Sequence, residues 1–350
     1  MPLRVAIISP TFGAYGGLEA FVLTLAAGLP LESGSDVRIF FKRTAGFRLQ
    51  PALEVGIESL SNRTSFVNRG SFALIRALAW ADVVHAQNPS ADTVLGSILL
   101  RRPVLMNVIN HRLPGRSVGQ RLWDYCLRRA DRRFYISEFV RQTWEGTTTW
   151  PGSEVVFPIC RLADGVKVPG QRNGFIFAGR WIANKGVDTL VEAYAQAGLD
   201  PAVWPLTIIG DGPLRTTIER RVRELALRGL AMPGFLSETA KAEAIRSARF
   251  MVIPPNTRED FGLTAIEARH AGVPCIITRD GGLPEAAGNE ALSCEPGSVA
   301  DLATCLRAAA AMPAAEYARR SEATRATLAG KLRPPAFYDA AYRELHRIRS

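Results

Sequence analysis

Residues 258–285 read REDFGLTAIEARHAGVPCIITRDGGLPE, and this stretch decides the expected fold and the expected site. It predicts a helix that begins near Phe261, followed by a strand over 273–278 and a glycine turn. The first N–H groups of a helix have no partner within it and its dipole is positive there, so such an end binds phosphate well. We therefore expect an anion such as a diphosphate at this helix.

Two glutamates lie on either side of the predicted helix start. At about 1.5 Å per residue, Glu267 lies about 7 Å beyond the first amides, comparable to the distance from a diphosphate to its ribose. Glu259 precedes the helix and falls on the opposite side of the phosphates. Carboxylates accept hydrogen bonds from hydroxyl groups well, so the pattern fits a sugar nucleotide.

Strand-like apolar runs alternate with helical patterns along the whole chain, which favours parallel α/β layers. In the first half we expect strands over 3–9, 37–41, 82–85, 104–109 and 133–136, and a helix over 18–29. In the second half we expect strands over 174–178, 206–210, 250–253 and 273–278, and helices over 187–197, 214–227 and 263–271. The motifs described below each follow a strand, where doubly wound sheets bind their ligands.

The length of 350 residues exceeds what one ordinary core fills, so two domains are expected. Proline and glycine punctuate a short linker at Pro158, Gly165, Pro169 and Gly170. We predict a first Rossmann-like domain over 1–163 and a second over 171–330. An amphipathic helix over 331–350 is expected to pack back towards the first domain.

The charge distribution and the cysteines indicate where in the cell the protein is expected to act. The net charge is +10, and the segment from Arg101 to Arg141 holds ten arginines against three acids. This segment is either a solvated face or a surface for anionic membrane, since no nucleic-acid module accompanies it. Five scattered cysteines, no spanning apolar run and no signal pattern predict a cytoplasmic protein, peripheral to the inner face of the cell membrane if the basic segment binds it.

Two cations follow the first strand of the second half. Arg180 and Lys185 can grip a diphosphate, the arginine as a fork and the lysine as a point charge, although two exposed loop cations would look the same. The turn over 210–213 marks a sharp strand-to-helix junction. Phe235 and Leu236 either present backbone groups to a base or end another strand.

These pieces, in this order, resemble the retaining glycosyltransferases of family 4, which have the GT-B fold of two Rossmann-like doubly wound domains facing a central cleft. The resemblance covers nearly the whole chain. Its most specific part is the pair of glutamates in EDFGLTAIEA, followed by AGVP. The remaining matching segments are GGLE at 16–19, DVVH at 82–85, ISEFVR at 136–141, GR and KG at 179–186, GDGP at 210–213 and GGLPE at 281–285.

The resemblance implies a role for each matching residue. Arg180 and Lys185 bind the donor diphosphate and stabilise the leaving group, Glu259 holds the donor sugar, and Glu267 holds the ribose. The other implied donor contacts are Gly16, Gly17, Phe235, Leu236, Phe261, Gly262, Leu263 and Thr264. The family retains anomeric configuration without a required metal, and this chain has no Asp-x-Asp cluster.

Histidine near the reacting carbon is the least determined part of the expected site. Family members carry one in the first domain, and here the candidate is His111, with Asn110 as an alternative occupant of that position. His85 ends another predicted strand and is expected to line the acceptor cleft.

The expected activity is transfer of a hexose from a UDP- or GDP-linked sugar to a lipid-linked, oligosaccharide or polysaccharide acceptor, with no cofactor. The alternatives are a GT-B epimerase or phosphorylase, and a catalytically silent sugar-nucleotide-binding subunit of a glycan assembly complex. A dinucleotide-dependent oxidoreductase is disfavoured, because the turn over 13–17 lacks the Gly-x-Gly-x-x-Gly spacing.

Overall fold

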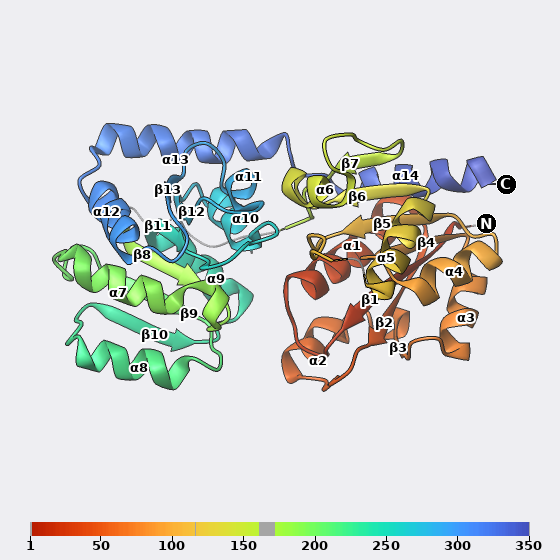
Figure 1. The fold of residues 1–350 in the computed structure, drawn as a ribbon, viewed down its shortest axis with the longest axis horizontal. Coiled ribbons are helices and arrows are strands. Elements are labelled where there is room, and N and C mark those ends of the chain that lie inside the picture. The colour runs from red at the N-terminus through yellow and green to blue at the C-terminus, as the bar shows by residue number, and fades with distance from the viewer. Residues whose placement is uncertain (1, 116, 161–171, 350) are drawn as a thin grey trace. The chain divides into compact units, whose positions relative to one another are not determined.

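A computed structural model describes residues 2–115, 117–160 and 172–349, without the side chains of residues 30–33. The chain forms two compact units (Figure 1). Unit 1 comprises Met1–Cys160 and Leu332–Ser350, and unit 2 comprises Arg161–Lys331. Gly165, Pro169 and Gly170 of the predicted linker, and the predicted domain limits at 163 and 171, lie outside the described residues.

Unit 1 is built on a seven-stranded parallel sheet with the order β3-β2-β1-β4-β5-β6-β7. The strands are β1 (Arg4–Thr11), β2 (Asp36–Arg43), β3 (Thr64–Val67), β4 (Val83–Gln87), β5 (Val104–Val108), β6 (Arg132–Tyr135) and β7 (Ser153–Val155). The central strands carry continuous apolar runs because helices cover both faces of a parallel sheet. Accordingly, Val5, Ile7 and Val84 have no exposed surface.

The helices of unit 1 include one from the far end of the chain. They are α1 (Gly17–Ser33), α2 (Pro51–Glu58), the short 3₁₀ turn η1 (Ser61–Arg63), α3 (Phe72–Trp80), α4 (Ala91–Leu99), α5 (Val118–Arg129), α6 (Glu138–Glu145) and α14 (Pro335–Arg349). Helix α14 packs against α1, β4 and β5. Its Tyr338 and Tyr342 are fully buried there, so the last residues of the chain complete the core of unit 1.

Unit 2 repeats the same plan with a six-stranded parallel sheet in the order β10-β9-β8-β11-β12-β13. Its strands are β8 (Asn173–Ala178), β9 (Leu206–Ile209), β10 (Leu230–Gly234), β11 (Ala248–Ile253), β12 (Cys275–Thr278) and β13 (Leu292–Cys294). Its helices are η2 (Ala183–Lys185), α7 (Val187–Ala197), α8 (Arg215–Glu224), α9 (Glu238–Ser247), α10 (Leu263–His270), α11 (Leu283–Ala287), α12 (Val299–Ala310) and α13 (Ala314–Ala329).

Each sheet has one point at which the strand order reverses. In unit 1 it lies between β1 and β4, and in unit 2 between β8 and β11. Loops that leave the carboxyl ends of two such strands diverge to opposite sides of the sheet and leave a crevice between them. In unit 2 this crevice is where the predicted Arg180, Lys185 and Glu259 are placed by the topology.

Candidate functional site

The loops after β8 and β11 are held together by backbone contacts. Gly186 has φ 67°, and a Cβ built on it would lie 1.8 Å from the carbonyl oxygen of Pro254. The amide of Asn256 donates to the carbonyl oxygen of Asn184 at 3.0 Å. Only glycine permits this approach, so the glycine next to Lys185 has a structural reason to be there.

The loop after β12 joins the same surface. Gly281 has φ 66°, and a Cβ on it would lie 2.1 Å from the carbonyl oxygen of Glu259. The amide of Gly282 donates to that same oxygen at 2.8 Å. The carboxyl ends of three neighbouring strands therefore form one continuous platform, with the backbone of Glu259 at its centre.

Charged side chains stand on this platform. Lys185 donates to Glu259 at 2.5 Å, and their side chains are 27% and 17% exposed. Arg180 directly follows Gly179 at the end of β8 and is exposed. The structure thus pairs two residues that lie 74 positions apart in the chain and were predicted to act on different parts of one donor.

Helix α10 begins beside these charges, as predicted. Its N-cap is Gly262 with φ 101°, a conformation that glycine adopts easily, and Leu263 is its first residue. The buried ring of Phe261, which is 1% exposed, anchors the turn. Leu263 and Thr264 lie in the first turn, where backbone N–H groups have no partner within the helix.

Glu267 lies one turn into α10 and is buried, with 8% exposure. Lys241 of α9 donates to its Oε1 at 2.8 Å. Burial raises the pKa of Glu267, and the charge and hydrogen bond of Lys241 oppose that rise. The sequence prediction missed Lys241, because the charge pattern of the segment 238–247 gives no sign of a partner on another helix.

Phe235 and Leu236 follow the end of β10, as the second of the two predicted alternatives stated. Phe235 is 75% exposed, a large apolar side chain in open solvent, whereas Leu236 is half-buried. The amide of Gly210 donates to the carbonyl oxygen of Gly234 at 2.9 Å, which joins this loop to the one after β9. An exposed aromatic ring at this edge can stack on a base.

The predicted residues of unit 1 lie at the carboxyl edge of its own sheet. Gly16 precedes α1, and its carbonyl oxygen accepts from the amide of Ala20 at 2.9 Å, while Gly17 is the first residue of the helix. His111 follows β5, and its ring lies 6.0 Å from that of Phe139.

The expectation that His85 lines an acceptor cleft is wrong. His85 lies within β4 and has no exposed surface. Its Nδ1 lies 2.7 Å from the hydroxyl of Tyr342, and burial lowers its pKa to about 3. Helix α14 covers it, so His85 is a neutral core residue.

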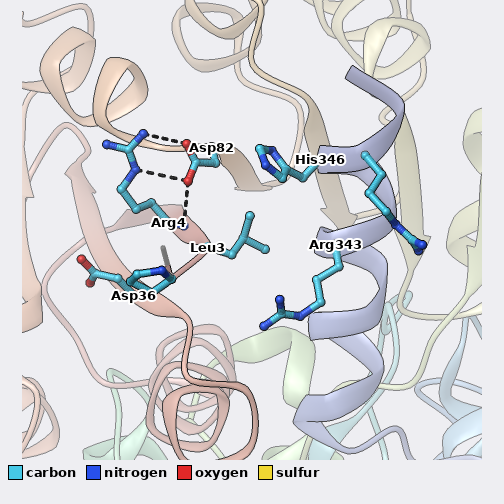
Figure 2. A pocket seen from close by; sticks show the side chains of 8 residues that line it. Leu3, Arg4, Asp36, Asp82, Arg343 and His346 are labelled. Carbon is cyan, nitrogen blue, oxygen red and sulfur yellow. Dashed lines mark hydrogen bonds and ion pairs between the residues drawn. The ribbon is translucent and has the colours of Figure 1, made fainter. Parts of the chain in front are cut away.

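A cavity of about 890 Å³ lies elsewhere in unit 1, at the amino ends of β1 and β2 (Figure 2). It is lined by Pro2, Leu3, Arg4, Asp36, Asp82, Arg343, His346 and Arg347. Two of its arginines have carboxylate partners: Arg4 pairs with Asp82 at 2.7 Å (Figure 2), and Arg343 pairs with Asp339 at 2.7 Å. Because these pairs satisfy one another, we assign the cavity no ligand.

Among the described residues, three or more His, Cys, Asp or Glu side chains nowhere come together as metal ligands would. Within the same residues, each helix is too short or too polar to cross a bilayer.

The match to a known family model lies in unit 2. Residues 163–327 match the family model Glycosyl transferases group 1. The glycogen synthase of Mycobacterium tuberculosis is 33% identical over 156 residues, which are 44% of this chain and 37% of that protein. The GDP-mannose-dependent alpha-(1-6)-phosphatidylinositol dimannoside mannosyltransferase of the same species is 30% identical over 113 residues, 31% of this chain and 28% of that protein. The chain thus matches about a third of the length of these curated relatives.

Solved structures extend the likeness to both units. The protein HepE of Anabaena, crystallised in complex with UDP, superposes with a TM-score of 0.80 at 15% identity, covering 98% of this chain and 99% of that one. At this identity the likeness shows the fold alone. With the two Rossmann-like parallel sheets described above, it confirms the predicted GT-B fold.

Proposed function

We propose that this chain, whose residues 163–327 match the family model Glycosyl transferases group 1, transfers a hexose from a nucleoside-diphosphate sugar to an acceptor. The observation that carries the proposal is the placement of Arg180, Lys185 and Glu259 at the reversal point of the unit 2 sheet, beside the start of α10. Two cations, a helix N-terminus and a carboxylate are what a diphosphate joined to a sugar requires.

Each side chain has a defined task in this reaction. Arg180 and Lys185 stabilise the negative charge that grows on the departing nucleoside diphosphate. Glu259 accepts hydrogen bonds from hydroxyl groups of the donor sugar, and its pairing with Lys185 holds both groups at the reacting end. Glu267 accepts from the ribose. We infer that the sugar is transferred with retention and without a metal, with the leaving phosphate taking the acceptor proton.

The donor is a UDP- or GDP-linked hexose in this proposal. HepE was crystallised with UDP, and the mannosyltransferase relative is named for GDP-mannose. The acceptor is a lipid-linked, oligosaccharide or polysaccharide glycan. The roles predicted for Gly16, Gly17 and His111 of unit 1 belong to the same proposal.

A thermal-shift screen against UDP- and GDP-linked sugars tests the donor, because a ligand that prefers the folded state raises the unfolding temperature. The donor that binds is then incubated with the protein, and released nucleoside diphosphate is measured for wild type, Arg180→Ala and Glu267→Ala. We expect donor consumption to collapse in both variants. Near-normal rates in both would reject the assigned site, and a product that carries no transferred sugar would favour an epimerase.

We also infer that the basic face of unit 1 meets an anionic membrane at the inner face of the cell. Helix α5 and the loop before it expose Leu113, Val118 and Trp123, which are 55%, 84% and 40% exposed. Arg121, Arg128 and Arg129 are exposed on the same helix. Apolar side chains among cations are typical of an interfacial helix.

Not every arginine of the segment 101–141 contributes to that face. Arg133 and Arg141 are buried, with 4% and 5% exposure, and both lie 3.7 Å from Glu145.

Sedimentation with neutral and with anionic vesicles tests the membrane proposal. We expect binding only to the anionic vesicles, weakened when Arg121, Arg128 and Arg129 are changed to Gln. Equal sedimentation of wild type and triple variant would contradict it.

A further inference from the structure

Glu267 has a partner on one oxygen only. Its Oε1 accepts from Lys241, whereas its Oε2 is buried and has no hydrogen-bond partner among the described residues. A carboxylate has about four acceptor positions, so most of the acceptor capacity of Glu267 is unused. A buried oxygen left unpaired is unfavourable, so the carboxylate of Glu267 can accept a further hydrogen bond from a bound donor group.

Lys241 is fixed in place by its own helix. Ser237 caps α9, and its side chain accepts from the amide of Ala240 at 3.2 Å. Lys241 stands in the first turn after this cap, 19% exposed, with Nζ also 2.9 Å from Glu238. The ammonium group therefore sits between an outer carboxylate and the buried one.

Lys241 opposes the effect of burial on the charge of Glu267. Burial alone would lower the pKa of Lys241, but the charges and hydrogen bonds of Glu267 and Glu238 outweigh it, so the pKa is raised. The ammonium group thus stays charged, and it favours the ionised form of Glu267, which burial opposes. An ionised carboxylate accepts hydroxyl protons in more directions and more strongly than a protonated one does.

We propose that Lys241 is a positioning residue for ribose recognition. It favours the ionised form of Glu267 and holds the carboxylate in one orientation, so that the remaining acceptor positions of the carboxylate receive the ribose hydroxyl groups of the donor. This inference rests on the proposed function, in which Glu267 faces the ribose. Lys241 itself touches neither the phosphates nor the transferred sugar in this proposal.

The test is discrimination between a ribonucleotide and its 2′-deoxy counterpart, measured by titration calorimetry with UDP or GDP and the matching 2′-deoxynucleoside diphosphate. In wild type we expect the ribonucleotide to bind at least about tenfold more tightly, the range of one hydrogen bond to a charged group. Lys241→Met lowers affinity for the ribonucleotide to near that of the deoxynucleotide and leaves the latter nearly unchanged. Its retained affinity for the deoxynucleotide also shows that it is folded.

Two variants separate positioning from a merely structural pair. Lys241→Arg restores a cation and should restore discrimination. Glu238→Gln removes only the outer partner of Lys241 and should keep the discrimination between the two nucleotides. Should Lys241→Met not fold, Lys241→Gln, which lacks the charge, replaces it.

Three results would overturn part of this account. Wild-type discrimination in Lys241→Met, or an equal loss for both nucleotides, would overturn the role of Lys241 alone. Failure of wild type to bind any nucleoside diphosphate would overturn the proposed function and this inference with it.

Discussion

The two sheets of this protein share one strand order, yet their carboxyl edges are built differently. In unit 2 the loops after β8 and β11 present Arg180, Lys185 and Glu259 to solvent or to one another near the surface. In unit 1, Lys42 at the end of β2 is 6% exposed and donates to Asp92 at 2.7 Å and also to Ser90. The same topology thus places charged side chains at the carboxyl edge of both sheets. The buried charges of unit 1 stabilise the fold, whereas the partly exposed charges of unit 2 can bind a ligand.

The largest expected effect is on activity, and it distinguishes the Lys185–Glu259 pair of unit 2 from the Lys42–Asp92 pair of unit 1. Lys185→Ala should lower the rate of donor consumption by roughly 10²–10³-fold, because the leaving diphosphate loses a cation. Asp92→Asn should leave the rate per folded molecule near that of wild type. Release of nucleoside diphosphate under saturating donor measures both. A small effect of Lys185→Ala would place the diphosphate elsewhere.

For stability we expect the opposite order, with the larger effect at the Lys42–Asp92 pair of unit 1. Asp92→Asn leaves the buried ammonium group of Lys42 without a counter-charge, and we expect the free energy of unfolding of unit 1 to fall by about 3 kcal/mol. Glu259→Gln removes the partner of a partly exposed cation and should change stability by less than about 1 kcal/mol. Denaturant unfolding of both variants gives the comparison, and similar losses in the two would show that the buried pair is not structural.

Acid should weaken unit 1 through the same pair. Burial by itself raises the pKa of Asp92, but hydrogen bonds from Lys42 and Ser90 outweigh it and lower the pKa to about 2. Since an unfolded aspartate titrates near about 4, this contribution is complete above that pH and is lost as the pH falls towards 2. Unfolding free energies of wild type and Asp92→Asn should therefore converge between about pH 4 and pH 2. A difference that stays constant over this range would contradict the shift.

The smallest effect concerns the platform itself. Gly281→Ala brings a methyl group towards the carbonyl oxygen of Glu259 and should weaken donor binding by about tenfold as the loop shifts. Gly297→Ala is the matched control, because Gly297 has φ 73° but no atom within 4 Å of the added Cβ. Equal donor affinities in the two variants would contradict the effect assigned to the contact with Glu259.

The interior of both sheets could be predicted from the sequence, and their edges could not. The hydrophobic pattern missed β3, β7 and β13, and it indicated β10 only as one of two alternatives for Phe235 and Leu236. These four are the outermost strands of the two sheets. Edge strands are covered on fewer sides, so they lack the continuous apolar runs that identified β1 or β8. β7 has the sequence SEV with none of its residues buried, and β10 contains a proline.

The candidate site was predictable where residues follow a strand in the chain, and not where helices meet in space. Arg180 and Glu259 could be placed because the carboxyl ends of parallel strands share one edge. Lys241 reaches Glu267 across two helices that lie 26 residues apart at this contact, and no local pattern encodes that approach. His85 was misplaced because a polar residue at a strand end looks the same in sequence whether or not a later helix covers it.

Titration calorimetry with UDP and with GDP tests the central claim most directly, namely that the carboxyl edge of unit 2 grips a nucleoside diphosphate. The comparison is wild type against the double variant Arg180→Ala/Lys185→Ala, with Arg220→Ala on the exposed face of α8 as a charge control. We predict that one of the two nucleotides binds wild type and Arg220→Ala alike, and binds the double variant at least about tenfold more weakly. Equal affinity in all three proteins would contradict the account.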